Sequence, residues 1–184
     1  MFKTIFFSLW FFAPAGLGNL CAFASGKIRF LKKYNYPVDG FKKFRGKRIL
    51  GSHKTVRGFI FAIIAGMIGC SLEVFLYNTF FGIRQIIPLD YSFINPVILG
   101  GLLGFGALFG DAVKSFFKRQ KGIQPGRSWF PFDQTDYIIG GLFFSLFAVR
   151  LDTFYYLLIF IVGFLIHPLG TFIGFLLKLR RKPL

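Results

Sequence analysis

The stretch FINPVILGGLLGFGALFG, from Phe93 to Gly110, decides the fold of this chain. It carries no charged residue, and as a helix rising about 1.5 Å per residue it would cross most of the hydrocarbon core of a bilayer. Small residues recur within it at a spacing that lets transmembrane helices pack closely, at Gly100, Gly101, Gly104 and Gly106. A phosphate-binding glycine loop is less favoured, because no P-loop or GxGxxG fingerprint follows a strand. The stretch therefore predicts a membrane helix packed tightly against its neighbours.

The rest of the chain is just as apolar. It has 54% apolar residues, 29 Phe among 184 residues and a mean hydropathy of +0.60, which is unusual for a soluble domain of this size. We expect an all-α integral membrane protein with a single transmembrane domain over residues 1–184 and five spans, at residues 4–25, 59–81, 93–110, 137–149 and 153–177. The fourth span would reach only about 20 Å. Its shortness favours a polar cavity open to one side.

The first segment resembles a secretory signal peptide, because Lys3 precedes an apolar run that ends in Ala22-Phe23-Ala24. Pro14 and Asn19 lie inside the run, and the cations that follow would hinder export. A retained first helix is therefore the favoured interpretation.

The cations predict how the chain is oriented. All of the 23 Lys and Arg residues except Lys3, Arg84 and Arg150 lie within residues 27–58, residues 111–136 or the carboxyl-terminal tail. Positive loops are retained in the cytoplasm, so we expect two cytoplasmic basic loops, the amino terminus outside and the carboxyl terminus inside. The formal charge of +16 then faces anionic headgroups on one side of a cell membrane. No nucleic-acid module is present in the loops, so no nucleic-acid partner is expected.

Acidic residues gather in GDAVKSFFKRQKGIQPGRSWFPFDQTDY, from Gly110 to Tyr137, although the chain has only 7 Asp and Glu. If the third helix continues past the membrane, Asp111 shares a face with Lys114, Ser115 and Lys118. Asp133 and Asp136 are three residues apart and share a face at the start of the fourth span. These acids suit Mg²⁺, which prefers oxygen ligands and completes its shell from substrate phosphates. The alternative is that the acids form salt bridges with the neighbouring Lys and Arg.

A second polar constellation precedes the second span, in GKRILGSHKTVRG from Gly46 to Gly58. Lys54 and Arg57 would share a helical face beside glycines that let a ligand approach the backbone. This arrangement suits a triphosphate. Cations that only set topology would look the same, and the spacing leaves both interpretations open. Glu73, deep in the second span, is expected to face helix neighbours or the outer interface.

The blocks GKRILGSHKTVRG, GDAVKSFFKRQKGIQPG and PFDQTDYIIGGL together resemble the CDP-archaeol synthase family, relatives of the phosphatidate cytidylyltransferases. The resemblance runs from about Pro14 to Gly141. Pro14-Ala15 with Asn19 is similar to the opening motif of the family, although the proline usually found shortly after that Asn is missing. The resemblance implies transfer of CMP from CTP to an isoprenoid glycerol phosphate lipid, with release of pyrophosphate.

The resemblance also implies roles for particular residues. Asp111, Asp133 and Asp136 would hold Mg²⁺, and Lys118 would join them as the fourth catalytic residue. The residues expected to bind substrate are Lys54, Thr55, Arg57, Ser115, Arg119, Asn19 and Asp39. A lipid phosphate is already an ionised nucleophile, so the chemistry requires aligned and neutralised polyanions and no Ser, Cys or His attacker.

Alternatives to this function differ in what they require of the sequence. A CDP-alcohol phosphotransferase would carry DGxxAR followed by GxxxDxxxD, but Phe-Lys-Lys-Phe follows Asp39-Gly40. A small transporter or scaffold would place its polar groups near the bilayer midplane, whereas here they gather at the predicted inner surface. Apolar spans do not distinguish isoprenoid from acyl chains, so an acyl glycerol phosphate acceptor stays open, as does a homodimer.

Overall fold

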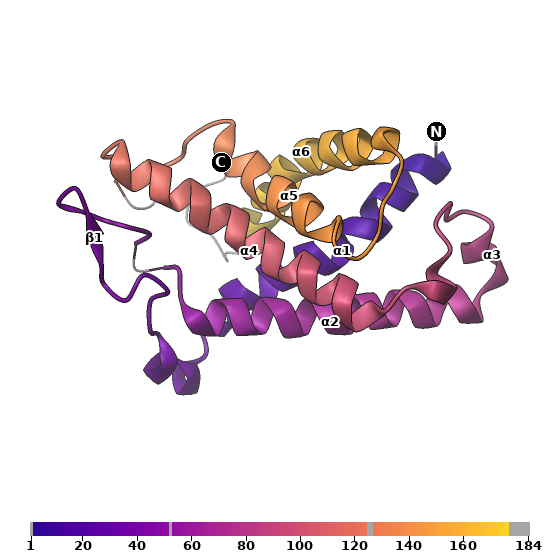
Figure 1. Cartoon of the computed structure of the whole chain (residues 1–184), viewed down its shortest axis with the longest axis horizontal. Coiled ribbons are helices and arrows are strands. Elements are labelled where there is room, and N and C mark those ends of the chain that lie inside the picture. The colour runs from indigo at the N-terminus through magenta and orange to yellow at the C-terminus, as the bar shows by residue number, and fades with distance from the viewer. Residues whose placement is uncertain (1, 52, 125–126, 177–184) are drawn as a thin grey trace.

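The computed structural model describes residues 2–51, 53–124 and 127–176, with side chains up to residue 166. Five helices of 14 residues or more make up most of it (Figure 1). They are α1 (Phe2–Ser25), α2 (Val56–Thr79), α4 (Pro96–Gln120), α5 (Phe132–Ser145) and α6 (Thr153–Leu176). Among the described residues, α1, α2 and α4 are long and apolar enough to cross a membrane. The protein is therefore a mostly helical membrane protein, as the composition predicts.

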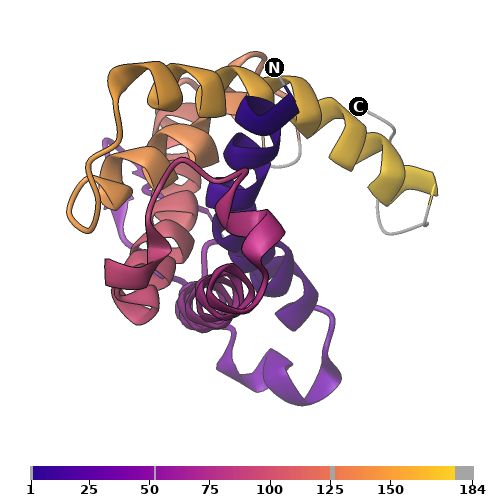
Figure 2. The ribbon, with the colours of Figure 1, turned by 90° about the vertical axis from the view of Figure 1, so that its right-hand side faces the viewer.

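Helix α4 lies at the centre of the packing. It contacts α1, α2 and α5, while α6 packs against α1 and α5 (Figures 1 and 2). Glycines make these contacts close, because a Cβ on Gly104 would collide with the Ala62 carbonyl of α2, and one on Gly106 with the Gly140 carbonyl of α5. The predicted close packing at the glycines of the third span is confirmed.

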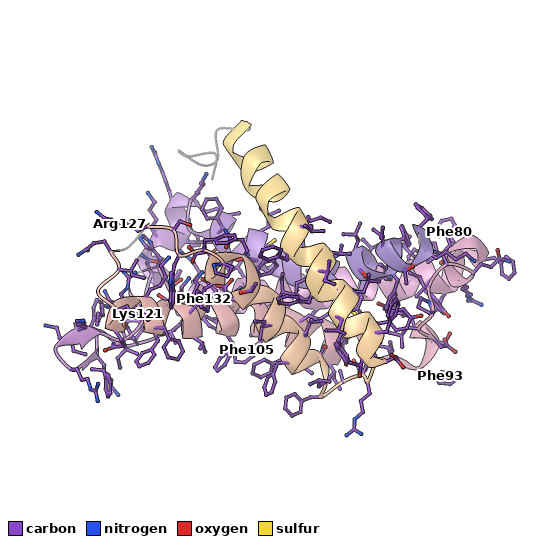
Figure 3. All side chains as sticks on the ribbon, turned by 90° about the horizontal axis from the view of Figure 1, so that it is seen from above. Phe80, Phe93, Phe105, Lys121, Arg127 and Phe132 are labelled. Carbon is purple, nitrogen blue, oxygen red and sulfur yellow. The ribbon has the colours of Figure 1, made fainter. Side chains whose placement is uncertain are left out.

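The connections differ at the two ends of the bundle (Figure 1). At one end, the segment between α1 and α2 holds a 3₁₀ helix, η1 (Arg29–Tyr34), and two antiparallel strands, β1 (Lys43–Phe44) and β2 (Lys47–Arg48). At the other end, a short helix α3 (Phe81–Arg84) and a 3₁₀ turn η2 (Tyr91–Phe93) lead into α4. Figure 3 places Lys121, Arg127 and Phe132 at the first end and Phe80 and Phe93 at the second. Both predicted basic loops therefore lie at the same end of the molecule.

Helix boundaries depart from the predicted spans in two informative places. Helix α4 continues past Gly110 to Gln120, and α5 begins at Phe132 rather than at Tyr137 and ends at Ser145. Hydropathy indicates which part of a helix is apolar enough to lie in lipid and does not indicate where the helix ends. It therefore did not predict the polar end of α4 or the polar start of α5. The two-residue strands are a small departure from an all-α fold. The number of spans, their orientation and the polar cavity stay predictions, and the basic tail lies outside the described residues.

Candidate active site

Three acids from two helices meet around one ammonium group. Lys114 Nζ lies 3.0 Å from Asp111 Oδ1, 2.9 Å from Asp133 Oδ1 and 2.6 Å from Asp136 Oδ2. The extension of α4 past Gly110 carries Asp111 and Lys114, and the first turns of α5 carry Asp133 and Asp136. We call Asp111, Asp133 and Asp136 the carboxylate cluster. The sequence placed Lys114 on this face but assigned it no role, although its i+3 spacing from Asp111 is a signal for an ion pair.

Two further lysines flank the cluster. Lys54, just before α2, forms an ion pair with the second oxygen of Asp111. Lys118 Nζ lies 3.1 and 3.2 Å from the two oxygens of Asp133, and it also donates a hydrogen bond of 2.6 Å to the Arg127 carbonyl. Three carboxylates therefore face three ammonium groups in a region where each side chain is less than a quarter exposed. The alternative that the sequence left open, salt bridges between these acids and neighbouring lysines, is the arrangement in this structure.

The backbone between α4 and α5 also contributes to the cluster. The Trp129 amide donates a 2.5 Å hydrogen bond to Asp133 Oδ2, four residues ahead of it. Lys118 reaches the carbonyl of Arg127 in the same segment. Sequence reasoning missed both contacts, because they are made by the backbone carbonyl of Arg127 and the backbone amide of Trp129, whose positions the residue types do not reveal.

The cluster fits a divalent cation in its donor chemistry. Asp136 Oδ2 is buried, and the ammonium of Lys114 lies 2.6 Å from it. Carboxylate oxygens are the ligands that Mg²⁺ prefers, and here they already converge on one positive charge. Within the described part of the chain, no group of three His, Cys, Asp or Glu side chains closes into a metal site in this arrangement. Lys114 Nζ occupies the position between the three carboxylates.

Asp39 organises the loop between η1 and α2. Its carboxylate accepts hydrogen bonds from the guanidinium of Arg48 at 3.0 and 3.1 Å and from the amides of Phe41, Leu50 and Gly51. Burial opposes the ionisation of Asp39, but Arg48 and the three amides outweigh it and lower the pKa to about 2. All of these partners belong to the same loop, so the structure places Asp39 as a loop organiser and does not bring it to the cluster.

Two contacts fasten this loop onto α4. The Ser115 hydroxyl donates to the Leu50 carbonyl, and Lys47 Nζ donates to the Gln120 carbonyl at 2.7 Å. The predicted substrate residue Ser115 is thus engaged with the backbone. Arg119 differs, because its Nε is buried without a hydrogen-bond partner among the described residues. It is a candidate donor to a phosphate.

The other predicted substrate residues have mainly local contacts. Thr55 caps α2 by accepting a 3.2 Å hydrogen bond from the Gly58 amide. Arg57 donates to the Leu31 carbonyl at 2.8 Å and to Asn35 Oδ1 at 3.2 Å, which ties η1 to α2. Asn19 is exposed on α1 and makes no hydrogen bond to the carboxylate cluster. Helical spacing put Lys54 and Arg57 on one face, but Lys54 precedes the helix and points to Asp111 instead.

A separate apolar cavity of about 480 Å³ lies between α1 and α2, lined by residues that include Trp10, Pro14, Leu72 and Glu73. It contains none of the residues of the carboxylate cluster. Glu73 is 7% exposed, and its Oε2 has no hydrogen-bond partner among the described residues. The prediction that Glu73 faces helix neighbours is consistent with this burial.

Known proteins of one family resemble this chain over nearly its whole length. A family profile described as CarS-like, CDP-archaeol synthase, matches residues 1–183. A CDP-archaeol synthase of Methanocaldococcus jannaschii is 31% identical over 182 residues, with 97% of each chain covered. One of Methanosarcina barkeri is 34% identical, covering 92% of this chain and 98% of its own. A solved structure described as an intramembrane enzyme for archaeal membrane lipids biosynthesis has a TM-score of 0.68 at 23% identity, covering 88% of this chain and 90% of its own.

Proposed function

The chain belongs to the CDP-archaeol synthase family and is a CTP-dependent lipid cytidylyltransferase, and from this premise we propose that it transfers CMP from CTP to an isoprenoid glycerol phosphate with the help of Mg²⁺. The observation that carries the proposal is the convergence of three acids and three lysines from three separate segments at one end of the bundle. Such a set of charges suits two polyanions that must be brought together. A transporter or scaffold is excluded by the family.

The proposed metal ligands are Asp111, Asp133 and Asp136. Their donor type fits, and the convergence of the three carboxylates on one positive charge supports the assignment. When bound, Mg²⁺ would neutralise negative charge on the CTP phosphates. The protein itself would hold the two anions in line and exclude competing water.

The transfer needs no covalent enzyme intermediate. A non-bridging oxygen of the lipid phosphate forms a bond to the α-phosphorus of CTP, and the bond from that phosphorus to the oxygen bridging to the β-phosphate breaks. The electron pair leaves with pyrophosphate, so atoms and charge balance without a proton transfer. Lys54, Lys118 and Arg119 are the cations proposed to stabilise the phosphates, and Arg119 has a buried N–H available for this.

The acceptor lipid and the side of the membrane belong to the proposal as well. The family favours an isoprenoid ether lipid over an acyl lipid. We propose that the cluster opens to the cytoplasm, because most cations of the chain lie in the two loops at its end and in the tail. CTP would then reach the cluster from the cytoplasm and the lipid from the inner leaflet.

The test is an assay of purified protein with labelled CTP, Mg²⁺ and a panel of isoprenoid and acyl glycerol phosphates, scored for CDP-lipid. Isoprenoid acceptors are expected to give the highest kcat/KM. Asp133→Asn should lose at least about a hundredfold in kcat, the scale of losing one charge-stabilising group, while the protein stays folded. Asp152→Asn is the matched control, because Asp152 is exposed and caps Phe154, a role that Asn also fills. Turnover retained by Asp133→Asn would remove Asp133 from the metal site.

A further inference from the structure

The lysine at the centre of the carboxylate cluster occupies the place of a metal ion. Lys114 Nζ lies 2.6 to 3.0 Å from oxygens of all three acids, and its side chain is only 14% exposed. No other lysine of the cluster contacts more than one of these acids, since Lys54 pairs with Asp111 and Lys118 with Asp133. Lys114 is therefore the lysine that joins all three acids, and together with Lys118 it pairs α4 with α5 electrostatically.

We propose that Lys114 is an internal counter-cation, which balances the carboxylate cluster in the free enzyme and moves onto the substrate phosphates when Mg²⁺ and CTP bind. The inference rests on the proposed function, because it takes the cluster to be the metal site. It assigns Lys114 a positioning role that the sequence pattern did not reveal. The occupant that Lys114 gives way to is a hard divalent cation accompanied by a nucleotide polyphosphate.

Charge balance is the first reason. Three buried carboxylates without a cation would repel one another strongly. The cost of removing each carboxylate from water would also be uncompensated. With Lys54, Lys114 and Lys118 present, three negative charges face three positive ones. Each carboxylate of the free site therefore has a lysine partner without any metal.

Mutual exclusion is the second reason. A divalent ion bound by the same three acids would lie close to the present position of the ammonium, where two positive charges repel. Lysine has a flexible four-carbon stem and a point charge with no required partner geometry, so it can swing away. The incoming phosphates supply the anion that receives it, and Arg119, whose buried Nε has no hydrogen-bond partner among the described residues, lies further along α4.

This arrangement couples the two ligands. Mg²⁺ alone must displace Lys114 without offering it a new partner, whereas Mg²⁺ with CTP offers the phosphates. Binding of each should therefore strengthen binding of the other by the same factor, as thermodynamic linkage requires. The free enzyme is expected to bind Mg²⁺ weakly until the nucleotide is present.

The experiment uses full-length protein in detergent, with Mg²⁺ as the probe and no nucleotide. Lys114→Gln removes the counter-cation and leaves three acids against two lysines. We expect Mg²⁺ alone to raise the Tm of Lys114→Gln with a half-saturating concentration at least about tenfold below that of the wild type, a difference of about 1.4 kcal/mol in binding. Lys121→Gln is the charge-matched control, because Lys121 is exposed and contacts the Trp129 ring, and it should titrate like the wild type.

A second variant tests the inference even if Lys114→Gln does not fold. Lys114→Gln combined with Asp136→Asn restores the balance of two acids and two lysines, so it should fold without metal and lose the enhanced response to Mg²⁺. The inference is overturned if Lys114→Gln responds to Mg²⁺ as the wild type does, or if the double variant is no more stable than the single one without metal. Neither readout depends on turnover. Absence of CDP-lipid from the wild-type assay would instead count against the proposed function.

Discussion

At the residue scale, the same side chain serves two purposes according to its partners. Asp39 is held by Arg48 and three backbone amides of its own loop, whereas Asp136 Oδ2 is paired with the ammonium of Lys114 from another helix. A carboxylate held by several backbone amides stabilises its loop, and one paired with a flexible lysine can exchange that partner for a ligand. The structure gives Asp39 a structural role in its loop, and its assignment to substrate binding stays a prediction.

Replacing Asp39 with Asn should destabilise the loop in a pH-dependent way. The pKa of Asp39 is about 2, below the ordinary value of 3.8, so its ionised form stabilises the fold above pH 3.8 and this contribution disappears as the pH falls towards 2. At neutral pH we expect a loss of about 2 kcal/mol, or about 4–8 °C in Tm. Thermal unfolding followed by tryptophan fluorescence measures it. A Tm difference from the wild type that stays constant down to pH 2 would contradict the assignment of the charge.

At the scale of elements, the site depends on how closely α4 and α5 approach. A Cβ on Gly110 would collide with the backbone carbonyl of Asp136, and one on Gly140 with the carbonyl of Gly106. The helix that carries Asp111 is thus in direct backbone contact with the helix that carries Asp136. Small residues allow this approach, and the lysines then bridge a gap that is already short.

Gly110→Ala should separate α5 from α4 and disperse the carboxylate cluster. The expected result is a loss of CMP transfer of at least about tenfold, because a displacement of about 1 Å at reacting groups costs up to about a hundredfold. Gly16→Ala in α1 is the matched control, since nothing lies within 4 Å of an added Cβ there. Both variants are compared by CDP-lipid assay and by Tm. Full activity of Gly110→Ala would show that the cluster tolerates movement of α5.

Sequence reasoning predicted the membrane helices and the identity of the cluster better than its geometry. The apolar runs and the i+3 and i+4 spacings identified Asp111, Asp133 and Asp136, because these signals are local. The contact of Lys54 with Asp111 joins residues 57 positions apart, and no periodicity reports such a contact. The central position of Lys114 depends on how α5 docks on α4, which only the packing determines.

At the scale of the whole molecule, charge and chemistry occupy one end. The η1 segment, the β1–β2 hairpin and the connection between α4 and α5 all lie there, opposite α3 and η2 (Figures 1 and 3). The loops predicted to set the topology and the side chains proposed to bind phosphates thus lie at the same end. The same concentration of positive charge would then account for both the predicted cytoplasmic orientation and the proposed binding of phosphates.

Orientation can be tested with single cysteines in a Cys21→Ala background, because the remaining Cys70 is buried. Lys121→Cys, at the end of the bundle that carries the cluster, should react with an impermeant maleimide only after the cells are opened. Phe93→Cys, at a side chain 90% exposed at the other end, should react in intact cells. Gel-shift labelling measures both. The reverse pattern would place the cluster outside and contradict the proposed access of CTP from the cytoplasm.

The brevity of α5 has a consequence for the host membrane. Its 14 residues span about 21 Å as a helix, whereas hydrocarbon cores are about 30 Å thick. If α5 crosses, lipids around it must thin locally or let water descend beside the acids, at a modest cost for each ångström of mismatch. Turnover should then vary with bilayer thickness in reconstituted vesicles, so that the length of the surrounding lipid chains tunes the enzyme that builds such lipids.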